Sequence, residues 1–347
     1  MSDASPSERP RVVVFAILAA SIAIALGVYV AIRAIRARSP RSASSAEVAD
    51  AAQAQRALAT RPHVLFRDLR IEPSDAFGRL GASALDAPDA RLDATTPCMR
   101  VHFARAASSE RRGLCFEADV APDEHGSTAI LRGLDATWTP TWSRPMNGIP
   151  SRLRASPHGK IGAATIFVTG HSYDDETMST QTLIIDLATG EPIADLETFD
   201  IRRGDEKLGD GVNLWGVTFA DDDDTFYVTV ARAETTWLAK GSVSSRTLRT
   251  LRENVECPSL SPDQRTIAFK KRGVDRTDAH LFTLDLATLE DRAIPGETRV
   301  IDDQAEWLDG RTILYKYGTE VWAASITPSA PPRVFLERAS SPAIVER

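Results

Sequence analysis

The stretch ECPSLSPDQRTIAFKKR, Glu256 to Arg272, contains two short runs of β-forming residues joined by a tight turn and followed by three cations. In the turn, SPDQ, Pro fixes φ and Asp accepts hydrogen bonds from nearby backbone amides, so the motif needs no ligand to explain it. Two strands joined in this way are typical of a β-hairpin. Whether this hairpin stands alone or recurs along the chain decides which fold it predicts.

The hairpin recurs at a period of roughly 40–50 residues, and a second hairpin follows it in each repeat. Four antiparallel strands per repeat at this period are typical of a β-propeller blade. No long helical period interrupts these repeats. The clearest repeats are Arg152–Leu196, Leu214–Leu251, Cys257–Ile294 and Asp303–Leu336.

Two less regular repeats, His63–Ala94 and Cys98–Asp135, precede these, each with three recognisable strands. The first lacks an innermost strand, and SSPAIVE at 340–346 resembles the start of the Glu256 hairpin. A terminal strand that completes the first blade closes the ring and removes two exposed edges. The pattern therefore predicts an all-β fold, a β-propeller over residues 61–347 closed by the strand 340–346, and it favours six blades over seven.

The first 60 residues have a different character. After a polar tail at 1–11, residues 12–32 form a run of 21 residues without a charge. At about 1.5 Å per residue, this run crosses a hydrocarbon core of about 30 Å. A cleaved signal peptide is the alternative, but its apolar region is shorter and ends in a small-x-small site. We expect a single transmembrane helix at 12–32 and a flexible Ser- and Ala-rich linker at 33–60.

The charge is unevenly distributed along the chain. The formal net charge is −7. Residues 1–41 hold six Arg against Asp3 and Glu8, a balance of +4, so the remainder carries −7 less +4, which is −11. An acidic body argues against nucleic acid as a partner.

The side of the membrane on which the body lies is indicated by two opposing signals. Two Arg precede the apolar run and four follow it, which favours a cytoplasmic body. Cys98 and Cys115 flank a predicted hairpin, and a disulfide between them would indicate an oxidising compartment. Two reduced core cysteines are the alternative, and Cys257 is expected to be a buried thiol. No Cys or His spacing typical of a metal site is present.

The repeats PSLSPDQRTIAFKKR…HLFTLDLATLE and ASPHGKIGAATIFV…LIIDLATGEPI resemble the strand–SPDG–strand–DLxTGE repeat of TolB-like six-bladed β-propellers. The wider chain is similar to a group of bacterial single-span TolB-like translocation proteins. The resemblance covers residues 60–347 and is strongest over Arg152–Leu336. It implies a propeller on the extracytoplasmic side of the plasma membrane that binds a protein or peptide partner in the cell envelope, and we expect this location in spite of the Arg count.

Propeller topology places the starts of the innermost strands and the longest connections on one face, where recognition is expected. The candidate binding residues at this channel mouth and in these loops are Arg152, Arg154, His171, Tyr173, Asn213, Glu256, Lys270, Lys271, Arg272, Asp302, Asp303 and Glu306. A solvated or purely structural role is the alternative for each of them.

A hydrolase of the glycosidase or lactonase type, using carboxylates at the channel mouth, is the alternative function. The segment TGHSYDD, Thr169–Asp175, places His, Ser and Asp close together, but neighbouring side chains of one loop rarely meet in triad geometry. It also lacks the G-x-S-x-G pattern of a nucleophile elbow. No Gly-rich loop opens a helix, so nucleotide binding has no support. We expect a non-catalytic binding or scaffold module without catalytic residues, metal or cofactor.

Overall fold

The computed structural model describes residues 45–72, 76–105, 111–118, 129–170, 173, 178–209, 211–274 and 278–346. The chain divides into two compact units, residues 1–53 and 54–347. The predicted tail at 1–11 and transmembrane helix at 12–32 lie outside the described residues. Helix α2 (Ser45–Ala59) lies within the predicted linker. Among the residues described, no helix is both long enough and apolar enough to span a membrane.

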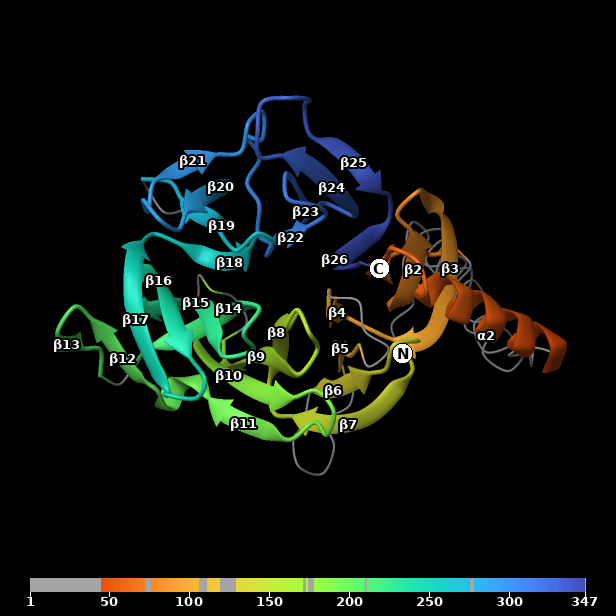
Figure 1. The fold of residues 1–347 in the computed structure, drawn as a ribbon, viewed down its shortest axis with the longest axis horizontal. Helices are drawn as coiled ribbons and strands as arrows, with labels where there is room; N and C mark the ends of the chain where they lie inside the picture. The colour runs from red at the N-terminus through yellow and green to blue at the C-terminus, as the bar shows by residue number, and fades with distance from the viewer. Residues whose placement is uncertain are drawn as a thin grey trace, which may run out of the picture. The chain divides into compact units, whose positions relative to one another are not determined.

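The second unit is a six-bladed β-propeller, as predicted (Figure 1). Over the described ranges, five blades are sheets of four strands and the fourth blade has six strands. One strand of each blade lies nearest the central channel. These innermost strands, in blade order, are β26 (Ala339–Val345), β4 (Arg100–Phe103), β8 (Ile149–Ala155), β14 (Asn213–Phe219), β18 (Glu256–Leu260) and β22 (Glu306–Trp307).

The other strands follow outward in the same order in each blade. Blade 1 continues with β1 (His63–Asp68), β2 (Arg79–Ala84) and β3 (Ala87–Pro97), and blade 2 with β5 (Gly113–Ala118), β6 (Ala129–Leu134) and β7 (Pro140–Met146). Blade 3 continues with β9 (Ile161–Thr169), β10 (Ser179–Asp186) and β11 (Pro192–Asp195), and blade 4 with β15 (Thr225–Arg232), β16 (Thr235–Ser242) and β17 (Thr247–Glu253). Blade 5 continues with β19 (Thr266–Arg272), β20 (Ala279–Asp285) and β21 (Asp291–Ala293), and blade 6 with β23 (Thr312–Tyr317), β24 (Glu320–Ser325) and β25 (Arg333–Leu336).

The last strand of the chain closes the ring. The strand expected at 340–346 is β26, which pairs antiparallel with β1 in a register that places Val64 opposite Ile344. Both side chains are fully buried. Blade 1 is thus built from the two ends of the propeller sequence, and the dark-blue β26 lies beside the orange strands of that blade (Figure 1). Neither end leaves an unpaired inner edge.

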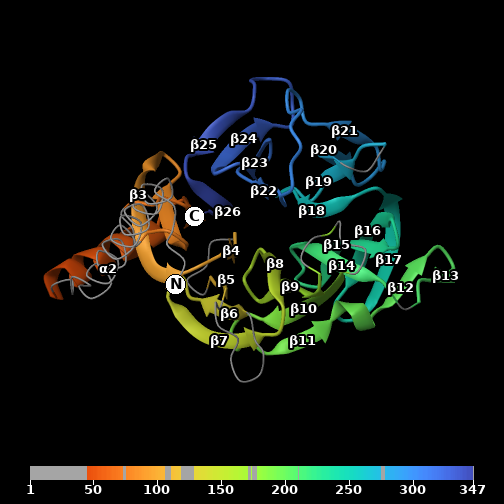
Figure 2. The ribbon, with the colours of Figure 1, turned by 180° about the vertical axis from the view of Figure 1, so that it is seen from behind.

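The two faces of the ring carry different connections. The turn face carries the turns between the first and second and between the third and fourth strands of each blade. The loop face carries the loops between the second and third strands and the links from one blade to the next. Figures 1 and 2 show the ring from opposite sides.

The repeat motifs are turn devices on the turn face. In SPDQ, the Gln264 N–H donates to the carbonyl oxygen of Ser261 at 2.9 Å, and Oδ1 of Asp263 accepts from the Arg265 N–H at 3.2 Å. Gln264 itself has a positive φ of 60°. In DLATG, Asp186 caps its turn in the same way through the amides of the next residues. These contacts satisfy the local backbone, so no bound group is required.

Blade 4 contains an unpredicted hairpin. The link from blade 3 to blade 4 begins with the 3₁₀ helix η1 (Leu196–Thr198) and contains the strands β12 (Asp200–Arg203) and β13 (Glu206–Lys207). β12 pairs in parallel with β17, which places Ile201 opposite Leu248, and both side chains are buried. The hairpin therefore covers the outer edge of blade 4, an edge that would otherwise be open to another strand.

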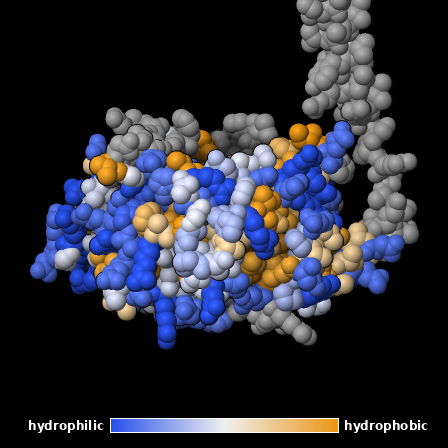
Figure 3. Space-filling model, turned by 90° about the horizontal axis from the view of Figure 1, so that it is seen from above, coloured by the Kyte–Doolittle hydropathy of each residue, from blue (hydrophilic) through white to orange (hydrophobic). Residues whose placement is uncertain are grey.

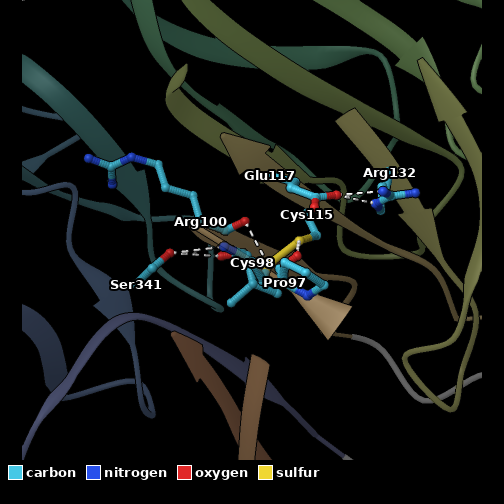
Figure 4. The surroundings of a disulfide bond; sticks show 8 residues. Pro97, Cys98, Arg100, Cys115, Glu117, Arg132 and Ser341 are labelled. Carbon is cyan, nitrogen blue, oxygen red and sulfur yellow. Dashed lines mark hydrogen bonds and ion pairs between the residues drawn. A yellow bond between two sulfur atoms is a disulfide. The ribbon is translucent and has the colours of Figure 1, made fainter. Parts of the chain in front are cut away.

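Cys98 and Cys115 form a disulfide inside blade 2 (Figure 4). Cys98 lies in the link before β4 and Cys115 on β5, with their Cα atoms 5.7 Å apart, a normal separation for a bonded pair. Both residues are buried against the apolar core that blade 2 shares with blade 1. Cys257 is a buried free thiol.

Candidate functional site

Glu306 is central to a network of charges in the channel. The residue is 5% exposed, its Oε2 accepts from Nη1 of Arg154 at 2.6 Å, and its Oε1 accepts from the Ile344 N–H at 3.3 Å. Burial raises the pKa of this carboxyl, but His102, Arg154 and Arg105 together lower it to about 2. Glu306 is therefore ionised at neutral pH and connects blade 6 to blades 3 and 1.

His102, on β4, has both ring nitrogens engaged in this network. The Ala155 N–H donates to its Nδ1 at 3.0 Å, and its Nε2 lies 3.2 Å from Oε2 of Glu306 and 2.7 Å from Nη1 of Arg154. Burial and the charge of Arg154 lower the pKa of His102. Both ring nitrogens are already engaged, so this histidine is not free to take a proton from a substrate.

A second group of ion pairs surrounds Lys270, on β19. Its Nζ donates to Oδ1 of Asp302 at 2.7 Å and lies 3.7 Å from Oε2 of Glu256. Arg272, two residues along the same strand, donates from Nε to Oε1 of Glu256 at 2.6 Å. Burial lowers the pKa of Lys270, but Cys257 and the two carboxylates raise it overall. The ammonium group is 2% exposed, so these carboxylates compensate a charge that would otherwise be buried alone.

Asp302 is the one carboxylate of this group that reaches solvent, with a side chain 78% exposed. The surrounding channel wall partly desolvates it, which raises its pKa. Lys270, Arg152 and Arg100 have the opposite and larger effect, so its pKa is well below the usual range. Asp302 is therefore an ionised group at the channel mouth on the loop face.

Arg152, on β8, lies between Asp302 and an aromatic group. Its Nη2 is 3.5 Å from Oδ1 of Asp302, and its guanidinium carbon is 5.2 Å from the centre of the Tyr173 ring. Tyr173 stacks on Trp215 with ring centres 4.3 Å apart, and its hydroxyl group is hydrogen-bonded to Ser151. Burial raises the pKa of Tyr173 to about 12, although Arg152 acts against it. The phenol is thus a protonated part of the channel wall.

Asp303 also has a partner, since its Oδ2 accepts from the Lys316 N–H at 2.8 Å. Three further candidates are not part of the channel network. Asn213 joins blades 3 and 4, because its Oδ1 accepts from the Thr180 N–H at 2.9 Å. Lys271 faces the opposite side of the sheet from its neighbours on β19 and forms an ion pair with Asp291. His171 lies outside the described residues.

The larger cavity of the channel opens on the turn face, opposite the mouth that the sequence pattern favoured. Its volume is about 240 Å³. The ends of the innermost strands converge on it, and the polar residues that line it are His102, Arg105, Arg154, His158, Thr218, Asp221, Ser259, Ser261, Gln264, Glu306 and Glu346. Only Arg154 and Glu306 among them were predicted. Each of the others lies at the end of an innermost strand or in the turn that follows, a position that the register of the repeats could have revealed.

The loop face carries most of the exposed apolar side chains. Seven of the nine large apolar side chains that are exposed in the described ranges lie at this face. They are at the ends of second strands, at the start of an innermost strand, or in the connections of this face: Ile71, Phe77, Ile149, Val168, Val274, Val300 and Tyr317. The other two lie on fourth strands: Ile193 is near the start of β11, which is the outermost strand of blade 3, and Leu251 is on β17, outside which β12 and β13 lie. Figure 3 shows the propeller edge-on: this side is hydrophilic over much of its area and carries a hydrophobic patch right of centre in the view.

The channel carboxyl groups are poorly suited to act as general acids. A carboxyl group that acts as a general acid needs a raised pKa, whereas Glu306 and Asp302 have lowered values. Both carboxylates are also paired with buried cations. Within the described ranges, no three His, Cys, Asp or Glu side chains are grouped so as to hold a metal ion.

Comparison with known proteins identifies the fold and not a family. No protein-family model matches the chain. No curated protein sequence matches it either. Solved structures do match: TolB from Acinetobacter baumannii is 14% identical, with a TM-score of 0.56, over 82% of this chain and 67% of that one.

Two further structures have a similar fold. A chain of the nidogen/laminin complex is 11% identical over 82% of this chain and 98% of its own, with a TM-score of 0.54. A functionally unknown protein from Desulfotomaculum acetoxidans is 11% identical over 83% and 99%, with a TM-score of 0.50. At such identities the likeness concerns the fold alone. The protein is a six-bladed β-propeller. Its blades have the TolB-like arrangement that the repeats predicted.

Proposed function

We propose that this protein is a non-catalytic binding module, anchored in the plasma membrane by residues 12–32, whose propeller binds a protein or peptide partner in the bacterial cell envelope. The observation that carries the proposal is the concentration of exposed apolar side chains on the loop face. Apolar side chains scattered singly over a surface are normal, but their gathering on one face is typical of an interaction site.

The loop face offers a partner both apolar and charged contacts. Val274 follows the cationic end of β19, and Tyr317 ends the neighbouring second strand, β23. Burying one such side chain contributes about 1.5–3 kcal/mol to association before the entropic cost of binding. Asp302 adds an exposed carboxylate at the channel mouth of the same face. A folded protein with polar groups between apolar contacts fits this surface better than a small ligand does.

The extracytoplasmic location is supported by the disulfide of blade 2. A bond between Cys98 and Cys115 is stable in an oxidising compartment and rare in the cytoplasm. The uncharged run at 12–32 supports the anchor by its length. The Arg residues that flank this run favour the opposite orientation, and reporter fusions to the C-terminus distinguish the two orientations.

Site-specific photo-crosslinking in intact cells tests the binding face. A photoreactive residue at Val274 or Tyr317 should yield the same adduct, while one at Ile193, on the outermost strand of blade 3, should yield none. Replacing Phe77 by Ser, elsewhere on the loop face, should weaken the Val274 adduct, and the matched rim change Ile193→Ser should not. Equal adducts from rim and loop face, or insensitivity to Phe77→Ser, would refute the proposed face.

A separate measurement tests the absence of catalysis. Purified protein should not hydrolyse a panel of glycosides and lactones above the uncatalysed rate. Turnover that disappears in Glu306→Gln, under conditions in which circular dichroism shows that the variant is still folded, would instead establish the hydrolase alternative.

A further inference from the structure

A second, smaller cavity inside the channel has an unusual lining. Its volume is about 30 Å³, room for one or two water-sized particles. Three arginines line it, Arg100 on β4 and both Arg152 and Arg154 on β8. The cavity shares Arg154 and Glu306 with the larger one, so the two lie next to each other. A cavity of this size excludes any ligand larger than a small ion.

The arginines that line this cavity have donors left over. Arg152 is 5% exposed and Arg154 is 7% exposed. The Nε–H groups of Arg100, Arg152 and Arg154 are all buried, and no atom of the described residues accepts from them. A buried donor without an acceptor is costly, and native proteins rarely keep three of them together. An acceptor that does not belong to the chain would remove this cost.

The charges around the cavity do not balance. The ion-pair network around the cavity includes the exposed Asp302 and the partly exposed Arg100. It contains six cations and five carboxylates, namely Arg100, Arg105, Arg152, Arg154, Lys270 and Arg272 against Glu256, Asp302, Asp303, Glu306 and Glu346. Arg100 has the weakest partner, since its Nη1 is 3.9 Å from Oδ1 of Asp303. Burial and the neighbouring charge of Arg152 lower the pKa of Arg100, yet a guanidinium group stays protonated in proteins. One positive charge is therefore left over.

We propose that this cavity binds one chloride-sized monovalent anion. A water molecule can accept some of the free donors but leaves the surplus charge in place. A small anion accepts several hydrogen bonds and neutralises that charge at the same time. Anion binding here does not require a partner at the loop face.

The anion holds the ring together across blades. Arg100 belongs to blade 2, Arg152 and Arg154 belong to blade 3, and the opposing carboxylates of Asp303 and Glu306 lie at the start of blade 6. An anion that binds the folded ring and not the unfolded chain raises the free energy of unfolding. This increase grows with the logarithm of the ratio of the anion concentration to its Kd.

The full-length protein in detergent tests this site by thermal unfolding in chloride. Ionic strength is kept constant with gluconate, an anion too large for the cavity. Wild-type Tm should rise by about 2–4 °C when chloride reaches tenfold excess over Kd. Arg100→Gln should abolish the rise, because it removes the surplus charge and one free donor. Arg132→Gln is the matched control, because Arg132 pairs with Glu117 on the neighbouring strand of blade 2 and lies outside the cavity lining. This variant should retain the chloride-dependent rise in Tm.

Diffraction from wild-type crystals grown in bromide gives an independent readout that does not need a variant to fold. An anomalous peak among the three arginines at millimolar bromide supports the site. A cavity filled by water only, or a chloride-dependent Tm that Arg100→Gln retains, would overturn it.

Discussion

Arg154 on β8 donates to Glu306 on β22 across the channel, with 2.6 Å between Nη1 and Oε2, although 152 positions separate the two residues in the chain. Blade 3 and blade 6 do not follow one another around the ring, so this ion pair forms only when the ring is closed. Both side chains are almost completely buried, with exposed fractions of 8% and 7%. The pair therefore depends on the closure of the propeller and also restrains it.

Glu306→Gln should strongly destabilise the propeller. The change leaves the charge of Arg154 buried without its carboxylate, and breaking one side of a buried pair costs about 3–5 kcal/mol. The free energy of unfolding, measured with urea, should fall by that amount. Glu191→Gln is the matched control, since its exposed pair with Arg144 should contribute at most about 1 kcal/mol. Equal losses in the two variants would contradict the structural role of the channel pair.

Acid should remove the contribution of Glu306. Its folded pKa of about 2 is lower than the ordinary value of 4.5, so its contribution is complete above about pH 4.5 and is lost as the pH falls towards 2. The difference corresponds to about 3 kcal/mol at about 1.4 kcal/mol per pH unit. The slope of unfolding free energy against pH should therefore be shallower in Glu306→Gln over this window. An unchanged slope would show that other carboxylates dominate the acid transition.

His63 should give a second and separate pH window. Its ring is buried, its Nδ1 lies 2.7 Å from the carbonyl oxygen of Arg61, and it packs against Trp138. Burial lowers the pKa of His63 to about 4, with a smaller contribution from Arg111. Neutral His63 thus stabilises the fold above pH 6.5, and this contribution is lost as the pH falls towards 4.

The variant His63→Phe retains a ring at this position and removes its titration. We expect the wild-type decline in unfolding free energy between pH 6.5 and 4 to be reduced in this variant. His158, whose side chain is 46% exposed, is the control, and His158→Phe should leave the decline unchanged. A decline of the same size in all three proteins would assign it to other groups.

The fold was predictable because each blade repeats local signals. The SPDQ turn at Ser261 and the DLATG turn at Asp186 cap their own backbones, so the sequence near each turn determines it. The hairpin β12–β13 carries no such repeated motif, because its place beside β17 depends on the burial of Ile201 against another strand. Local pattern cannot reveal that contact.

The site was predictable only in part, for a geometric reason. Charged residues at the starts of innermost strands are visible in the repeats, and Arg152, Arg154, Lys270 and Glu306 do meet in the channel. Which cation meets which carboxylate depends on the closed ring. Lys271 shows the limit of pattern alone, since one step along β19 turns its side chain to the opposite side of the sheet from Lys270.

The disulfide gives a prediction for stability and location together. Cys98 and Cys115 are 17 positions apart, and a bond that closes a loop of this length stabilises a fold by about 3 kcal/mol. Protein trapped with acid directly from cells should resist alkylation at both residues until it is reduced. Cys257, which is buried and unbonded, should react only after unfolding and serves as the internal reference.

The double change Cys98→Ser with Cys115→Ser should lower the free energy of unfolding, and added reductant should then have no further effect.

A C-terminal alkaline phosphatase fusion should be active in the same cells, while a β-galactosidase fusion should be inactive. Deleting residues 12–32 should abolish the membrane attachment of the full-length protein. Free thiols at both positions in acid-trapped cells, together with the reverse pattern of fusion activities, would place the propeller in the cytoplasm and require a partner there.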